Sequence, residues 1–325
     1  MPKVSVIVPV YNVSAYIEKC CRSLFAQTLD DIELIFVNDC TPDDSVEKII
    51  NTLELFPNRQ GQTRIVTMPS NGGQAAVRRQ GAILAKGDYI IHCDSDDWVD
   101  LDLYETLYDK AVAENADIVV CDEIYEETRG PVTHIVPQLP DCCRDVVRDF
   151  YKQPIGMFCH NKLVRRSLYV DNDVWPWDGL NMWEDNGLMT RLFFFGGKLS
   201  QIHTSYYHYN RTNMNAMTAG YGIKQVQQMI GVANNLTHFF IDQGCFEEYK
   251  KTVYAFQFLA KINLVTDSFT NLKLFYSLFP ECNKIAKELN PSAFSTKGKL
   301  RFYFVKFHAE WLFIVLFRIK NIFIR

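Results

Sequence analysis

Short apolar runs alternate with helical patterns over the first 121 residues of the chain. Runs of mainly β-branched and aliphatic residues predict buried strands at 4–10 and 32–37 and further strands at 64–68 and 117–121. Between them, apolar residues recur every three or four positions, as at Ile17, Cys20 and Leu24, which predicts helices. We interpret Gly87 as the glycine that ends the third helix. The repeated alternation predicts an α/β fold, with a mostly parallel sheet sandwiched by helices.

The stretch GDYIIHCDSDDW, residues 87–98, is a further buried strand that ends in carboxylates. Asp94, Asp96 and Asp97 follow its apolar residues directly. Carboxylates this close repel one another unless water or a cation separates them, and their oxygen atoms suit Mg²⁺ or Mn²⁺. The alternative is an acidic loop whose Asp96 or Asp97 caps the next helix. The local sequence leaves both interpretations open.

Polar residues follow each predicted strand, and in a parallel sheet these positions meet at one edge, where ligands bind. They are Pro9–Asn12, Asp39, Asn71–Gly73 and Asp94–Asp97. No glycine-rich dinucleotide fingerprint follows the first strand and no Walker phosphate loop occurs, so a nucleotide diphosphate held through a metal is the remaining interpretation. Asp39 could bind a base or cap its own turn. Arg78 could face a phosphate or be a solvated helix arginine.

The region after residue 121 holds a second group of candidate functional residues. Residues 122–160 predict a loop and an edge strand. Glu184 and Asp185 precede an apolar helix, where one of them could simply stabilise the helix start. Trp175, Trp177 and Trp183 could form a stacking surface for a sugar or belong to the core. His160 lies near the predicted site, although a lone histidine is more often a satisfied polar neighbour.

Composition narrows the classes of protein to consider. The chain has 325 residues, of which 48% are hydrophobic and 22% charged, as in ordinary globular proteins. Its net charge of −4 gives no support to nucleic-acid binding. The ten cysteines are scattered without a C-x-x-C pair, so we expect reduced thiols and a cytoplasmic protein. The first residues predict a strand, not a signal peptide.

The C-terminal third has a different pattern. Residues 225–290 are helical in periodicity. Residues 297–325 contain seven Lys or Arg and one acidic residue, and their longest apolar run, Trp311–Phe317, is far shorter than the roughly 20 residues of a spanning helix. This predicts an amphipathic helix lying on an anionic membrane, at the inner face of the cell membrane, or else one packed on the protein's own core. The expected division is a catalytic domain (halves 1–122 and 123–222), a helical extension (223–296) and this tail.

Five stretches, taken in order, resemble the family 2 glycosyltransferases. They are VSVIVPVYN (4–12), VNDCTPDDS (37–45), NGGQAAVRRQG (71–81), GDYIIHCDSDD (87–97) and WED (183–185), and the resemblance covers about residues 3–215. It implies the GT-A fold and inverting transfer of a sugar from a UDP-sugar, with Mn²⁺ or Mg²⁺. The expected acceptor is a hydroxyl of a saccharide or lipid-linked saccharide, as in surface polysaccharide synthesis.

The resemblance also implies roles for individual residues. It implies donor nucleotide contacts from Pro9, Tyr11, Asp39, Arg78, Asp94 and, in a loop at 206–222, Arg211. It implies a metal on Asp96 with Asp94 beside it, and a general base at Asp185. On the acceptor or sugar side we expect Trp183, Glu184 and His160. One departure is the sequence NDCT at 38–41, where the family usually has Asp-Asp or Asp-Asn followed by Gly-Ser.

Two other functions are compatible with parts of this pattern. A sugar-1-phosphate nucleotidyltransferase of related fold would carry a Gly-rich, basic loop after the first strand, and none follows Val10. A non-catalytic, membrane-docked nucleotide-sugar-binding module would have no need of Asp39, Asp94, Asp96 and Asp185, all of which are present. The leading interpretation is therefore an enzyme.

Overall fold

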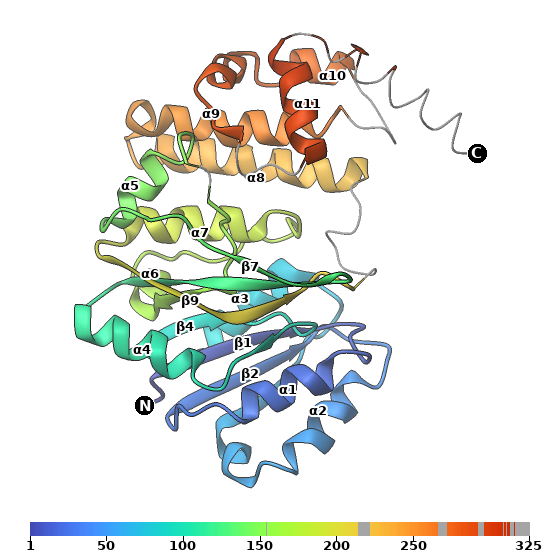
Figure 1. Ribbon diagram of the computed structural model, residues 1–325, viewed down its shortest axis with the longest axis vertical. Helices are drawn as coiled ribbons and strands as arrows, with labels where there is room; N and C mark the ends of the chain where they lie inside the picture. Colours follow the sequence, from blue (N-terminus) through green and yellow to red (C-terminus); the bar gives the residue numbers. More distant parts are fainter. Residues whose placement is uncertain are drawn as a thin grey trace. The chain divides into compact units, whose positions relative to one another are not determined.

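The computed structural model describes residues 1–153, 155–213, 222–265, 272–291, 296–307, 309, 311, 312 and 315. The chain forms two compact units, coloured along the sequence in Figure 1. The first comprises Met1–Arg144 and Met157–Ala216, and the second comprises Asp145–Gly156 and Met217–Arg325. The three-part division expected from the sequence remains a prediction.

The first unit is built on a nine-stranded sheet with the order β3-β2-β1-β4-β8-β6-β9-β5, and β7 pairs with β6. Its first four strands are parallel, as predicted: β1 Val4–Val10, β2 Ile32–Asn38, β3 Thr63–Thr67 and β4 Tyr89–His92. The residues of β1, β2 and β4 are almost all buried, which suits strands covered on both faces, whereas β3, at the edge of the sheet, is mostly half-buried. The carboxyl ends of β2, β1 and β4 therefore lie side by side.

The other half of the sheet is mixed. Its strands are β5 Trp98–Val99, β6 Ile118–Glu127, β7 Gly130–His134, β8 Lys162–Arg165 and β9 Leu199–Asn210. β8 is antiparallel to β4 and to β6, whereas β9 is parallel to β6 and antiparallel to β5. Residues 206–210, which the sequence suggested were part of a loop, are the end of β9. The buried side chain of Tyr207 fixes this strand in the core.

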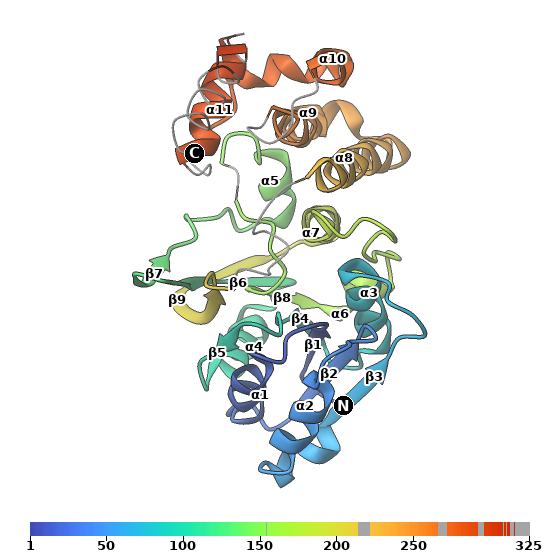
Figure 2. The same ribbon diagram turned by 90° about the vertical axis from the view of Figure 1, so that its right-hand side faces the viewer.

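Helices cover both faces of the first unit's sheet. They are α1 Ile17–Phe25, α2 Ser45–Leu53, the 3₁₀ turn η1 Pro57–Gln62, α3 Gln74–Leu84, α4 Leu103–Glu114, α6 Arg166–Val170 and α7 Glu184–Phe195. On β1, Val4, Val6 and Val8 belong to the core that includes α1 and α4. Ile7 points to the other face, where α3 packs closely because Gly81 has no side chain: a Cβ there would lie 2.3 Å from the Ile7 Cγ2. Figure 2 shows α1 and α4 on one side of the strands and α3 on the other.

The prediction that Gly87 ends the third helix is wrong. α3 ends at Leu84, and its C-terminal flanking residue, Ala85, has extended backbone angles. Gly87 lies beside β1 instead, where a Cβ would be 2.6 Å from the backbone nitrogen of Ser5. Glycine is required here by the close approach of two chain segments and not by the geometry of a helix end.

The second unit is helical in its described part. Its helices are α8 Ile223–Asp242, α9 Phe246–Ile262, α10 Leu272–Ser277, the 3₁₀ turn η3 Pro280–Lys287 and α11 Thr296–Lys306, and α5 Cys143–Arg148 leads into it. Residues 145–156 join this unit: Phe150 stacks on Phe256 of α9 at 4.4 Å, and the Thr252 hydroxyl donates to the Val147 carbonyl at 2.6 Å. Within the described ranges, no helix is both long and apolar enough to cross a membrane.

Candidate functional site

Asp39 follows β2 and fastens the loop in front of α3. Its Oδ1 accepts a hydrogen bond from the Gly72 N–H at 2.7 Å, and its Oδ2 accepts one from the Gly73 N–H at 2.8 Å. The alternative in which Asp39 caps its own turn is therefore wrong: that turn is capped by Asn38, whose Oδ1 accepts a hydrogen bond from the Thr41 N–H at 2.8 Å. A carboxylate has about four acceptor positions, so a further bond to a nucleobase remains compatible with this geometry.

The start of α3 is held by a residue that the sequence did not identify. The Asn181 Oδ1, from the segment before α7, accepts a hydrogen bond from the Ala75 N–H at 3.0 Å. Gly73 makes room for it: a Cβ at Gly73 would lie 2.3 Å from the Asn181 Nδ2, and Gly73 has a φ of +79°. The two segments that carry the predicted donor and base residues are thereby joined.

Arg78 is a buried bridge between two carboxylates. Its side chain is 3% exposed. Its Nη2 donates to the Asp94 Oδ1 at 2.6 Å, and its Nη1 donates to the Glu184 Oε1 at 2.6 Å. The alternative of a solvated helix arginine is therefore wrong. Contact of Arg78 with a phosphate remains a prediction.

One guanidinium contacts both carboxylates, but the pKa values of Asp94 and Glu184 shift in opposite directions. Burial opposes ionisation of Asp94, but the Arg78 charge and nearby His160 hold the pKa of Asp94 below its ordinary value. Burial raises the pKa of Glu184 to about 8, and Arg78 only partly opposes that shift. At neutral pH the arrangement therefore favours an ionised Asp94 and a protonated Glu184.

Asp185 differs from its neighbour in having an accessible carboxylate. It is half-buried, and its Oδ1 accepts hydrogen bonds from the backbone N–H and the side-chain amide of Asn186, at 2.7 and 2.8 Å. No described residue donates to its Oδ2. Burial raises the pKa of Asp185, which makes this oxygen a stronger proton acceptor than an ordinary aspartate.

Trp183, directly before the two acids, has an unusual backbone conformation. It is the residue before α7 and has a φ of +67°. Bulky residues rarely adopt positive φ, and such strained conformations cluster at functional sites. The other two predicted tryptophans are held by Arg191, whose guanidinium lies 3.8 Å from the Trp177 ring centre and donates to the Trp175 carbonyl. Sugar stacking on any of the three remains a prediction.

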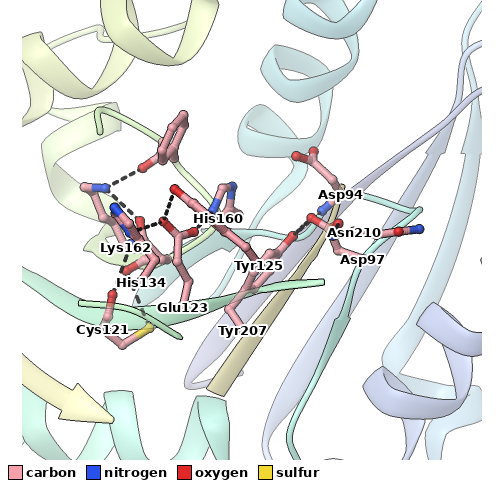
Figure 3. A network of polar contacts seen from close by, with 12 residues as sticks. Asp94, Asp97, Cys121, Glu123, Tyr125, His134, His160, Lys162, Tyr207 and Asn210 are labelled. Atoms are coloured by element: carbon pink, nitrogen blue, oxygen red, sulfur yellow. Dashed lines mark hydrogen bonds and ion pairs between the residues drawn. The ribbon is translucent and has the colours of Figure 1, made fainter. Parts of the chain in front are cut away.

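The three carboxylates after β4 have three different environments. Asp94 pairs with Arg78, as described. Asp97 is buried and accepts hydrogen bonds from the Tyr207 hydroxyl at 2.5 Å and the Asn210 N–H at 2.7 Å, which ties β9 to the strand end (Figure 3). Asp96 is half-buried and accepts from the Asn213 amide at 2.7 Å. Burial and the Asp94 charge raise the pKa of Asp96.

The carboxylates after β4 suit a metal site whose remaining ligands are water and substrate phosphates. Among the described residues, no group of three or more His, Cys, Asp or Glu side chains is placed to hold a metal ion. Asp96 can offer a carboxylate, with Asp94 close by in sequence. Mg²⁺-type sites commonly use one or two carboxylates and complete their shell with water and substrate phosphates. The residues therefore suit a cation that arrives with a diphosphate.

His160 is a buried member of a polar network (Figure 3). Its Nε2 lies 2.6 Å from the Glu123 Oε2, and its ring stacks on Tyr207 with ring centres 4.4 Å apart. In the same network, Lys162 donates to the Asn161 Oδ1 at 2.7 Å, and burial lowers its pKa to about 8. His160 therefore contacts both β6, through Glu123, and β9, through Tyr207. A sugar contact from it remains a prediction.

Three other predicted donor residues lie at the ends of strands. Pro9 is half-buried at the end of β1, and the next residue but one, Tyr11, is exposed. Arg211 follows β9, where it donates to Glu127 at 2.7 Å and lies over the Tyr125 ring. Of the predicted loop at 206–222, residues 214–221 lie outside the described residues. The Arg211–diphosphate contact remains a prediction.

The chain matches the family model of glycosyl transferase family 2 over residues 5–171, about half of its length. The Bacillus subtilis glycosyltransferase EpsH is 29% identical over 261 residues, which are 78% of this chain and 74% of EpsH.

Two solved structures share the fold. S. aureus TarS (residues 1–349), in complex with UDP-GlcNAc, is 18% identical with a TM-score of 0.65, covering 95% of this chain and 88% of that one. The mannosyltransferase PcManGT from Pyrobaculum calidifontis, in complex with GDP-Man and Mn²⁺, is 14% identical with a TM-score of 0.55, covering 95% and 87%. These comparisons confirm the predicted GT-A fold, and the chain belongs to glycosyl transferase family 2.

Proposed function

We propose that this glycosyltransferase is an inverting, metal-dependent enzyme that moves a sugar from a UDP-sugar to a hydroxyl of a saccharide or lipid-linked saccharide. The observation that carries the proposal is the grouping of Asp94, Glu184 and Asp185 around Arg78, at the edge where the parallel strands end. UDP-GlcNAc in TarS and Mn²⁺ in PcManGT support a nucleotide-sugar donor and a divalent cation.

The donor would lie along the ends of β1, β2 and β4. The exposed ring of Tyr11 would stack on the base, and Asp39, which holds the Gly72–Gly73 loop, would accept a hydrogen bond from the base. Asp96, with Asp94, would hold a Mg²⁺ or Mn²⁺. When bound, the cation would supply positive charge to the leaving diphosphate.

Asp185 is the general base in this proposal. Inversion requires the acceptor hydroxyl to attack the anomeric carbon from the side opposite the diphosphate while it loses its proton. The Asp185 Oδ2 can take that proton, because no described residue occupies it. Glu184 cannot do so readily, since it is buried, bonded to Arg78 and favoured in its protonated form. Its position suggests that it orients Arg78.

The experiment compares Asp185→Asn with the matched variant Glu184→Gln. A positioned base is typically worth about 10²–10⁴ in rate, so Asp185→Asn should lower kcat by that factor. UDP affinity, measured by titration calorimetry, should be unchanged. Glu184→Gln replaces a protonated acid with an amide of the same shape, so its effect on kcat should be much smaller. The opposite order of effects would assign the base to Glu184.

The pH profile gives a second readout of the same assignment. Below its pKa, Asp185 is protonated and cannot accept the hydroxyl proton. As the pH is lowered, kcat of the wild type should therefore begin to fall while the pH is still above the ordinary aspartate pKa of about 3.9, because the pKa of Asp185 is raised. A wild-type protein that binds UDP-sugars without transferring or hydrolysing them at any pH would be a binding module, and the proposal would be wrong.

A further inference from the structure

The helix α11 has two apolar faces with opposite environments. Phe302 and Val305 are buried in the second unit, where Phe302 meets Phe258 of α9 edge to face at 5.9 Å. This part of the tail therefore packs on its own core, as one alternative from the sequence predicted. The remaining apolar residues of the helix do not share that environment.

A second row of apolar side chains is exposed. Leu300 and Tyr303 lie three positions apart on α11, and Phe307 directly follows the helix end, where its N–H donates to the Tyr303 carbonyl at 3.0 Å. Trp311 follows four positions later in the sequence. Tyr303, Phe307 and Trp311 are 44%, 71% and 59% exposed. The rings of Tyr303 and Phe307 stack on each other, with centres 6.5 Å apart. We call Leu300, Tyr303, Phe307 and Trp311 the exposed stripe.

The sequence segment that contains the exposed stripe is basic. Residues 297–325 contain seven of the chain's 34 basic residues and one of its 38 acidic ones, although the net charge of the chain is −4. Lys299 is exposed beside the stripe and Lys306 is half-buried. The sequence of residues 297–325 therefore carries a formal charge of +6 (7 − 1), in a chain whose net charge is negative.

We propose that the exposed stripe docks on an anionic lipid membrane. Tyrosine and tryptophan favour the boundary between headgroups and acyl chains, because their rings are apolar and their edges carry a polar group. Lysine and arginine on the same segment pair with anionic headgroups. The side chains of the exposed stripe would enter the boundary between headgroups and acyl chains, as exposed apolar side chains of interfacial helices do. The buried face of α11, through Phe302 and Val305, attaches the helix to the second unit.

The proposal does not depend on the donor chemistry, so its failure can be told apart from failure of the proposed function. The test is co-sedimentation of the full-length chain with vesicles of mixed phosphatidylglycerol and phosphatidylcholine, and with phosphatidylcholine alone. The protein should sediment with the anionic vesicles at low salt, less at high salt, and little with the neutral ones. UDP affinity should be the same in all variants.

The decisive variant is Phe307→Ser/Trp311→Ser, which removes two exposed side chains and should leave the fold intact. Its affinity for the anionic vesicles should fall about tenfold or more, because apolar surface no longer leaves water. Lys299→Gln should cost about fivefold at low salt, close to the effect of one basic residue at such a surface. The matched control is Leu55→Ser in the first unit, since Leu55 is also exposed, and it should bind as the wild type does.

Three outcomes would overturn the proposal. The first is a wild-type protein that stays in the supernatant with anionic vesicles at low salt, and the second is a double variant that binds as tightly as the wild type. The third is a wild-type dimer, detected by light scattering, that the double variant converts to a monomer while vesicles have no effect. In that case a second copy of the chain covers the exposed stripe.

Discussion

Replacing Arg78 with methionine should destabilise the first unit more than any exposed substitution on α3. The change removes the cation from between Asp94 and Glu184 and retains most of the apolar part of the side chain. The neighbouring residue, Arg79, is a matched control. It pairs with Asp178 on the surface, and the two side chains are 39% and 67% exposed.

The expected magnitude follows from burial. Removing one partner of a buried ion pair costs about 3–5 kcal/mol, because the remaining charge is left unpaired. Asp94 is partly exposed and can also take up a proton, so we expect about 3 kcal/mol for Arg78→Met. The exposed pair of Arg79 is worth about 0–1 kcal/mol. For a unit of about 200 residues, a loss of 1 kcal/mol in the free energy of unfolding lowers Tm by about 2–4 °C. The Tm of Arg78→Met should therefore lie about 5–10 °C below that of Arg79→Met.

The assay is thermal unfolding of the wild type, Arg78→Met and Arg79→Met between pH 5 and pH 8. Without the Arg78 charge, burial should raise the folded-state pKa of Glu184, and of the partly exposed Asp94, above the unfolded values, so the folded variant should bind more protons than the unfolded one. Its stability should therefore recover as the pH falls, and the gap to the wild type should narrow towards pH 5. Adding Glu184→Gln to Arg78→Met should restore part of the loss at pH 8.

Two results would refute this reasoning. If Arg78→Met were no more destabilising than Arg79→Met, the buried bridge would not contribute to folding. If the loss were large but the same at pH 5 and pH 8, packing of the arginine side chain would explain it better than unpaired carboxylates. Arg78→Lys separates charge from geometry: it keeps the charge but loses the two-armed contact, so it should lie between the wild type and Arg78→Met.

Two further predictions concern the metal and the α3 loop. Asp96→Asn should remove the dependence of UDP affinity on Mn²⁺, measured by titration with and without the ion; an unchanged Mn²⁺ effect would place the cation elsewhere. Gly73→Ala should lower the free energy of unfolding by about 1–3 kcal/mol and weaken UDP binding, because Gly73 has a positive φ and an added Cβ would collide with Asn181. The control for thermal unfolding is Gly61→Ala, because a Cβ at Gly61 would meet nothing within 4 Å.

The sequence by itself determined the parallel half of the sheet. The apolar runs that became β1, β2, β3 and β4 are local signals, since a buried strand needs only a few adjacent apolar residues. The position of Asp94 and Asp96 at a strand end followed from the same local pattern. The basic, aromatic character of residues 297–325 was likewise visible in composition alone.

Only the tertiary structure decided which polar groups meet. Arg78 and Glu184 are separated by 106 residues, as are Ala75 and Asn181. No local periodicity reports such pairs, so the bridge and the helix cap were not predicted. The end of β9 was taken for a loop because Tyr207 becomes buried only when its hydroxyl reaches Asp97 across the sheet.

Glu184 and Asp185 show most clearly what the sequence determines and what only the tertiary structure decides. From the sequence they are adjacent acids at a helix start, and resemblance alone favoured Asp185. In the fold, the first turn of α7 directs Glu184 into the buried contact with Arg78 and leaves Asp185 half-buried with an unoccupied oxygen among the described residues. Burial and a charged partner set the protonation of a carboxyl, and both arise only when distant segments of the chain pack together.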